Sequence, residues 1–184
     1  MKTLKHIFIH MVLLVIIVFT IGIVLGAFYT PVGESARQIV ATSTSMTIVK
    51  SMSGDTFKFI MTIFFFNSIV AGILIMISGL KRISPYVKYI IYFELMYQMF
   101  AVSLLIGYAT HIISIPLILA SILPHGIIEV PVIILAAAYG VYLCQEVEED
   151  IFTIIPKYIR WCVAPLLIAA IIEVLITPLV MSLI

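Results

Sequence analysis

The chain has 184 residues, of which 64% are hydrophobic and only 10% are charged, and its mean hydropathy is +1.29. Soluble domains are about 45–50% apolar and about 25% charged, so this composition excludes a soluble enzyme, a disordered chain and a disulfide scaffold, and leaves an integral membrane protein. The net charge of +1, without a basic field, excludes nucleic acid as a partner, and Cys144 and Cys162 form no metal-binding spacing.

We predict an all-α protein with a single membrane domain, residues 1–184, and about five transmembrane helices. A spanning helix needs about 20 apolar residues. Stretches of this kind cover residues 7–28, 57–80, 86–108, 127–144 and 161–183. The first stretch is longer than the ~7–15 apolar residues of a signal peptide, so we expect it to be retained. We expect the polar segment 29–56 to be either an amphipathic helix on the membrane surface or a solvated loop.

The stretch that leads into the fourth span is apolar but interrupted by prolines at positions 116 and 124, and a third proline follows at position 131. Each proline lacks an amide donor and disfavours the helical turn before it. The segment Pro116–Leu123 is too short to cross a bilayer. We therefore expect a re-entrant or broken half-helix around Pro116–Pro131, which membranes tolerate where it is buried in protein or lines a wet cavity.

Basic residues outside the spans predict the orientation, because cytoplasmic loops are enriched in Lys and Arg. Because successive spans cross in opposite directions, three groups of basic residues fall on the same side of the membrane. They are Lys2 with Lys5, then Lys81, Arg82 and Lys88, then Lys157 with Arg160. We therefore expect the N-terminus inside and the C-terminus outside. A six-span topology would move the third group outside, which the same rule disfavours.

Three carboxylates fall in the apolar segments, namely Glu94, Glu129 and Glu173, and the one basic residue in the three spans that hold them is Lys88, at the edge of its span. A charge at the bilayer centre costs about 2.5–3.5 kcal/mol, so we expect at least one of the three to be protonated at pH 7 and the others to find polar partners. The available partners are Asn67, Gln98, His111, His125 and hydroxyl groups.

Spacing predicts which polar side chains share a helix face. The pairs four residues apart are Glu94 with Gln98, His125 with Glu129, and Glu173 with Thr177. Residues at this spacing are neighbours on a helix surface, so we expect the pairs to converge on one interior site. Three interpretations stay open: a polar cluster that fixes helix packing, a proton or solute pathway, and a metal site.

The metal interpretation rests on His125 and Glu129, with Glu173 as a third ligand. No other cofactor is expected. The sequence assigns no catalytic residue, because it lacks His-Glu-x-x-His, Gly-x-Ser-x-Gly and a glycine-rich phosphate loop.

Small residues four apart mark close helix contacts. The pairs are Gly22 with Gly26, Ser68 with Gly72, and Ala136 with Gly140. Each pair serves either packing within the chain or a homodimer contact.

The stretch from Leu123 to Gly140 resembles the signature of the stage II sporulation protein M (SpoIIM) family of polytopic membrane proteins. The matching positions are Pro124, His125, Gly126, Glu129, Pro131 and Gly140. Asn67-Ser68 is similar to an Asn-Asn element of that family, and Glu173-x-x-x-Thr177-Pro178 is similar to its C-terminal element. The resemblance covers residues 57–184.

This resemblance implies about five spans and a place in the plasma membrane of a prokaryote. In sporulating bacteria the family's namesake is a scaffold that holds peptidoglycan-degrading partners at the membrane. We therefore expect a non-enzymatic scaffold or complex subunit that contacts lipid, a second copy, or other membrane or cell-envelope proteins. A transporter or channel for a small solute, ion or proton is the alternative function, and a metal-dependent membrane enzyme is the second.

Overall fold

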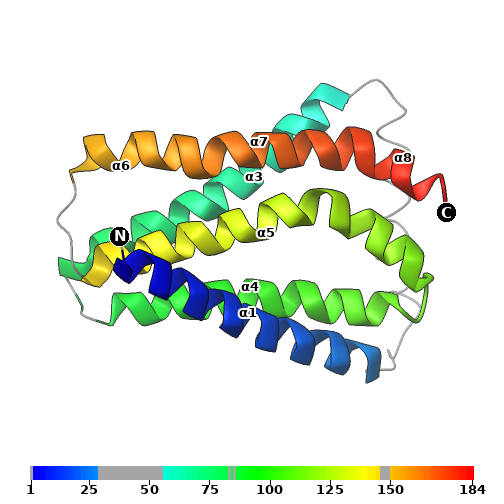
Figure 1. Cartoon of the computed structure of the whole chain (residues 1–184), viewed down its shortest axis with the longest axis horizontal. Helices are drawn as coiled ribbons and strands as arrows, with labels where there is room; N and C mark the ends of the chain where they lie inside the picture. The colour runs from blue at the N-terminus through cyan, green and yellow to red at the C-terminus, as the bar shows by residue number, and fades with distance from the viewer. Residues whose placement is uncertain (1, 29–55, 83, 85, 146–149) are drawn as a thin grey trace.

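The computed structural model of the chain describes residues 2–28, 56–82, 84, 86–145 and 150–184. These residues form helices and no strand (Figure 1). The helices are α1 (Lys2–Phe28), α3 (Thr56–Met76), η1 (Ile77–Arg82), α4 (Val87–Ala109), α5 (Ile115–Gln145), α6 (Ile151–Tyr158), η2 (Ile159–Val163), α7 (Ala164–Ile171), η3 (Ile172–Ile176) and α8 (Thr177–Met181). The last five follow one another without interruption and are called the C-terminal run below.

Five helical stretches are long and apolar enough to cross a membrane, and this confirms the predicted class and number of spans. They are Thr3–Phe28, Thr56–Lys81, Val87–Ala109, Ile115–Gln145 and Phe152–Met181. The predicted surface helix or loop lies, apart from Thr56, outside the described residues.

The spans alternate in direction, so the two chain ends lie at opposite ends of the molecule (Figure 1). The end that holds the N-terminus also holds the end of η1, the start of α4 and the start of α6. The three basic groups at residues 2–5, 81–88 and 157–160 therefore share one end, as the alternation requires. The side of the membrane on which this end lies stays a prediction.

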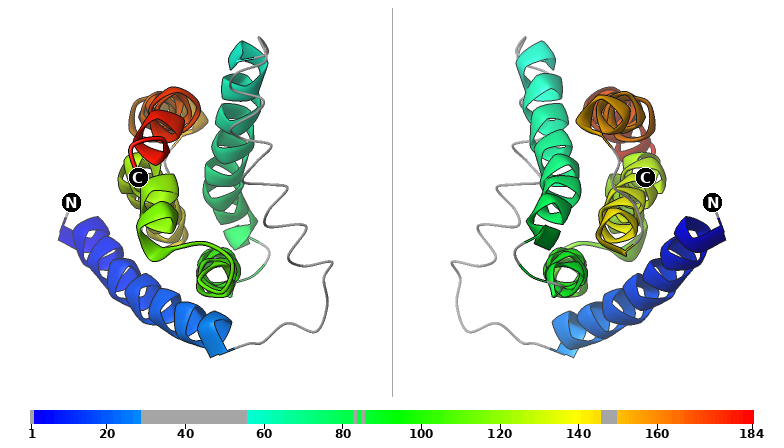
Figure 2. Two further views of the ribbon diagram at one scale, coloured as in Figure 1. Left: turned by 90° about the vertical axis from the view of Figure 1, so that its right-hand side faces the viewer. Right: turned by 90° about the vertical axis from the view of Figure 1, so that its left-hand side faces the viewer.

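Helix α5 is the centre of the bundle. It lies between the C-terminal run and α4, while α1 and α3 cross on opposite sides (Figure 2). In the most apolar stretch of α5, 56% of the residues are buried inside the protein, compared with 22–28% in the other four spans. Most of the outer helices' surface is therefore left for lipid or for other proteins.

The prolines bend α5 but do not divide it. The structure has one helix of 31 residues with Pro124 and Pro131 inside it, in place of the expected re-entrant or broken half-helix around Pro116–Pro131. Pro116 is the second residue of α5, where an amide has no helical partner, so its ring costs nothing there. Pro124 and Pro131 are two turns apart, so both missing hydrogen bonds fall on nearly the same face and curve the helix (Figure 1).

The glycines of α1 pack against α4. A Cβ atom on Gly26 would collide with the carbonyl oxygen of Leu104 and lie 2.9 Å from the amide nitrogen of Tyr108. A Cβ atom on Gly22 would collide with the Ser103 hydroxyl, and one on Gly107 would collide with the backbone of α1. The glycine pair of the first span therefore serves packing within the chain.

The other two small-residue pairs also face neighbours within the chain. A Cβ atom on Gly140 would collide with the carbonyl oxygen of Leu74 in α3, so α3 and α5 approach closely there. Gly72 faces the ring of Tyr158 in α6, and the Tyr158 hydroxyl donates a hydrogen bond to the carbonyl oxygen of Ser68.

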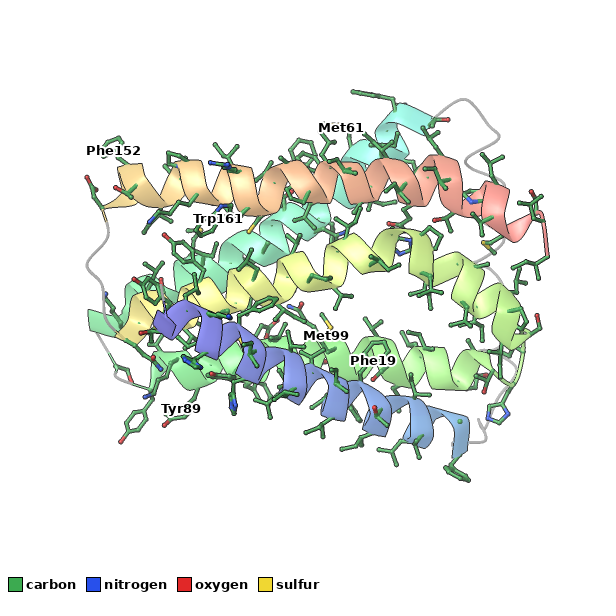
Figure 3. The ribbon with its side chains drawn as sticks, viewed as in Figure 1. Phe19, Met61, Tyr89, Met99, Phe152 and Trp161 are labelled. Atoms are coloured by element: carbon green, nitrogen blue, oxygen red, sulfur yellow. The ribbon has the colours of Figure 1, made fainter. Side chains whose placement is uncertain are left out.

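Aromatic contacts join the C-terminal run to α5 near the basic end. Trp161 meets Tyr139 of α5 edge to face, with ring centroids 5.8 Å apart, and points from the C-terminal run toward the rest of the bundle (Figure 3). Phe152 and Tyr89 point away from the bundle at the same end (Figure 3). The C-terminal run is thus held against α5 on its inner side.

Candidate functional site

The C-terminal run contains two π-helical turns, η2 and η3, and each is followed within two residues by a proline, Pro165 or Pro178. Proline removes an amide donor and crowds the preceding turn, and in both places the turn before the proline is π-helical. Glu173 lies in η3, and the Thr177 hydroxyl that follows donates to the carbonyl oxygen of Ile172 at 3.3 Å. Such turns are frequent at functional sites, and this makes Glu173 a candidate functional residue.

Three half-buried side chains meet where η3 lies against α5. One candidate ligand atom from each of His125, Glu129 and Glu173 can be chosen such that all lie within 4.8 Å of one another. His125 and Glu129 come from successive turns of α5, and Glu173 reaches them from the C-terminal run. We call these three residues the polar cluster.

Two further polar side chains contact the polar cluster. The Thr177 hydroxyl lies 3.5 Å from Nδ1 of His125, and Thr177 is only 3% exposed. The Asn67 side chain, from α3, donates a hydrogen bond to Glu129. The polar cluster with these two neighbours therefore connects α3, α5 and the C-terminal run.

The charges at this site are unusual for a membrane interior. Glu129 and Glu173 lie near enough to repel each other when both are ionised. The sequence has no Lys or Arg from Tyr89 to Pro156 or from Trp161 to Ile184, so neither α5 nor the later part of the C-terminal run supplies a cation. Glu129 is about 21 Å along α5 from its first residue, which is near the middle of the helix.

The third carboxylate predicted at the site lies elsewhere. Glu94 accepts a hydrogen bond of 2.8 Å from the Gln98 amide on α4, and it is not a member of the polar cluster. His111 is exposed beyond the end of α4, where its Nε2 lies 2.7 Å from the carbonyl oxygen of Ala27. Of the predicted site residues, the structure thus separates Glu94, Gln98 and His111 from the rest.

The π turns and two long-range contacts were not expected from the sequence. The signal for η3 was Pro178, five residues after Glu173 within an apolar helix. Lys81 donates a hydrogen bond of 2.7 Å to the carbonyl oxygen of Leu143 in the last turn of α5, and no local pattern indicates that contact. No local pattern in the sequence indicates the hydrogen bond from the Tyr158 hydroxyl to the carbonyl oxygen of Ser68 either.

Comparison with known proteins identifies the family of the chain. The family model described as Stage II sporulation protein M matches residues 15–178. This match includes the whole polar cluster, Asn67 and Thr177, and part or all of each of the five spans. No curated protein and no solved structure matches the chain. The chain belongs to the stage II sporulation protein M family.

Proposed function

We propose that the protein is a membrane scaffold or complex subunit whose shape is fixed by the polar cluster. The observation that carries this proposal is the meeting of side chains from α3, α5 and the C-terminal run at one place inside the bundle. The hydrophobic effect gives little drive for helices to associate in lipid, so close packing and hydrogen bonds between them set their arrangement. A fixed arrangement is what a scaffold needs in order to present a constant surface.

The second support for this proposal is a polar pair near the surface of α4. Glu94 and Gln98 are half-buried, and beside them Phe93 and Tyr97 are 69% and 61% exposed, with stacked rings 6.2 Å apart. Lipid chains cannot hydrogen-bond a carboxyl group, whereas a helix of another protein can. We propose that this face of α4, defined by Phe93, Glu94, Tyr97 and Gln98, contacts a helix of another membrane protein chain.

A photo-crosslinking amino acid at Tyr97 tests the α4 face in native membranes. We expect a protein adduct of constant mass at this position, and we expect its loss when Glu94 and Gln98 are both replaced by Leu. The matched control is Phe66 on α3, which is 70% exposed and should give lipid adducts alone. Lipid adducts alone at both positions would contradict the proposed contact.

The role of the polar cluster is tested by stability. We expect His125→Ala and Glu129→Gln to lower the free energy of unfolding by about 0.5–2 kcal/mol each, the range measured for polar contacts between membrane helices. Glu94→Gln is the control, because Glu94 lies outside the polar cluster and keeps a polar side chain. If both cluster variants unfold like the wild type, the polar cluster does not hold the helices together.

Transport is the second candidate function, and the observation that favours it is the π turn η3. An interrupted helix that carries an ionisable residue inside the membrane is a feature of many transporter sites. Reconstitution into vesicles that contain a pH-sensitive dye tests this function. A proton or solute flux that Glu173→Gln abolishes supports transport, and no flux under several gradients counts against it.

A further inference from the structure

We infer that His125, Glu129 and Glu173 bind a divalent transition metal ion such as Zn²⁺, which joins α5 to the C-terminal run. The inference rests on the proposed role of the polar cluster as the tie between these helices. The metal ion would complete the contact between α5 and the C-terminal run.

The set of ligands suits such an ion. Imidazole nitrogen and carboxylate oxygen are both common zinc ligands, and combined sets of these two donors also bind iron and manganese. Two ligands come from successive turns of one helix face, and the third comes from a neighbouring helix. Ligands drawn from two helices let one ion fix the distance between them.

The distances allow binding after small side-chain movements. A tetrahedral zinc ion with bonds of about 2.0–2.2 Å holds its ligand atoms roughly 3.3–3.6 Å apart. The three candidate atoms already lie within 4.8 Å of one another, so their separations need to shrink by no more than about 1.5 Å. Rotations about carboxyl and imidazole side-chain bonds cover this range without movement of the backbone.

The charge balance favours a dication. Two carboxylates and a neutral imidazole carry a charge of −2, and neither α5 nor the C-terminal run beyond Arg160 contains a basic side chain to offset it. An unpaired charge inside a membrane is costly, and one divalent ion makes the site neutral.

The neighbours of the polar cluster orient the ligands. Metal-binding histidines usually engage their second ring nitrogen in a hydrogen bond, and carboxylate ligands are usually hydrogen-bonded as well. Thr177 lies beside Nδ1 of His125, which leaves Nε2 for the metal, and Asn67 donates to Glu129. Thr177 and Asn67 thus provide the outer contacts that such a site requires, an observation independent of the three ligands themselves.

The test is metal analysis of the full-length protein purified in detergent. The protein is equilibrated in turn with Zn²⁺ and Mn²⁺, freed from unbound ions, and measured by elemental analysis and by thermal unfolding with and without a chelator. We expect about one bound ion per chain in the wild type and in Glu94→Gln, and less than about a tenth as much in His125→Ala and Glu173→Gln. The metal should raise the unfolding temperature of the wild type and of Glu94→Gln, and it should leave that of His125→Ala and Glu173→Gln unchanged.

A second variant keeps the test decisive if the ligand variants fail to fold. Thr177→Val retains all three ligands, and we expect it to bind the ion about 10–100-fold more weakly, as for other changes in outer contacts. Absence of metal from folded wild-type protein after both equilibrations overturns the inference. If His125→Ala and Glu173→Gln are then still less stable than the wild type in chelator, the polar cluster holds the helices together without an ion. If they are as stable as the wild type, both the metal site and the structural role of the polar cluster are refuted.

Discussion

Replacing Gly26 by alanine tests how α1 is held in the bundle. The new Cβ atom would collide with the carbonyl oxygen of Leu104 and lie 2.9 Å from the amide nitrogen of Tyr108 and 3.1 Å from Cα of Gly107. All three neighbours are backbone atoms of α4, so no side chain can rotate out of the way. Helix α1 must therefore move away from α4 along much of their shared surface.

The expected loss of stability follows from two opposing effects. Overpacking of a close contact costs about 1–3 kcal/mol, while alanine gains up to about 1 kcal/mol over glycine within a helix. Gly126→Ala in α5 is the matched control, because its Cβ atom would meet only a side-chain methyl of Ile122 at 3.4 Å, an ordinary contact. The helical gain is common to both variants, so Gly26→Ala should be about 1–3 kcal/mol less stable than Gly126→Ala.

The assay is unfolding by a denaturing detergent, followed by circular dichroism, with the oligomeric state measured by light scattering. We expect the loss of stability to appear with no change in the oligomeric state. The reasoning is refuted if the two variants have equal stability. It is also refuted if Gly26→Ala changes only the association of chains, because the glycine pair would then form a homodimer contact.

Two further contacts have measurable effects in the same unfolding assay. Tyr158→Phe removes the hydroxyl group that donates to Ser68, and it should lower the free energy of unfolding by about 1 kcal/mol, whereas Tyr89→Phe at an exposed position should have no effect. Lys81→Met removes the hydrogen bond to the carbonyl oxygen of Leu143, and we expect a loss of about 1–2 kcal/mol with faster hydrogen exchange in the last turn of α5. Wild-type exchange in that turn would show that the lysine does not support the end of the helix.

The spans and their alternation could be predicted from the sequence because hydrophobic length is a local property of the chain. The pairing of His125 with Glu129 could also be predicted, because residues four apart share a helix face whatever surrounds them. The meeting of this pair with Glu173 depends on how the C-terminal run packs against α5, and Glu173 lies in the π turn η3 just before Pro178.

The position of Glu94 and the course of α5 depend on packing between helices, which cannot be predicted from local sequence patterns. Helix α4 is rotated so that the stripe with Leu95, Met99, Ser103 and Gly107 is buried, and the glycines of α1 fix that rotation. Glu94 is one position away from this stripe and so misses the interior site. The prolines of α5 bend the helix instead of ending it because their effects fall on one face of a well-packed helix.

Cross-linking between positions 129 and 173 is the most direct test of the account, because the polar cluster exists only if these two side chains meet. Cysteines replace Glu129 and Glu173 in a chain whose two native cysteines are serines, with an inserted protease site between α5 and α6. A short bifunctional thiol reagent should keep the two fragments joined after cleavage in native membranes, while the control pair at positions 94 and 173 should separate. Separation of the 129–173 fragments, in protein that is folded and labelled at both cysteines, would contradict the polar cluster.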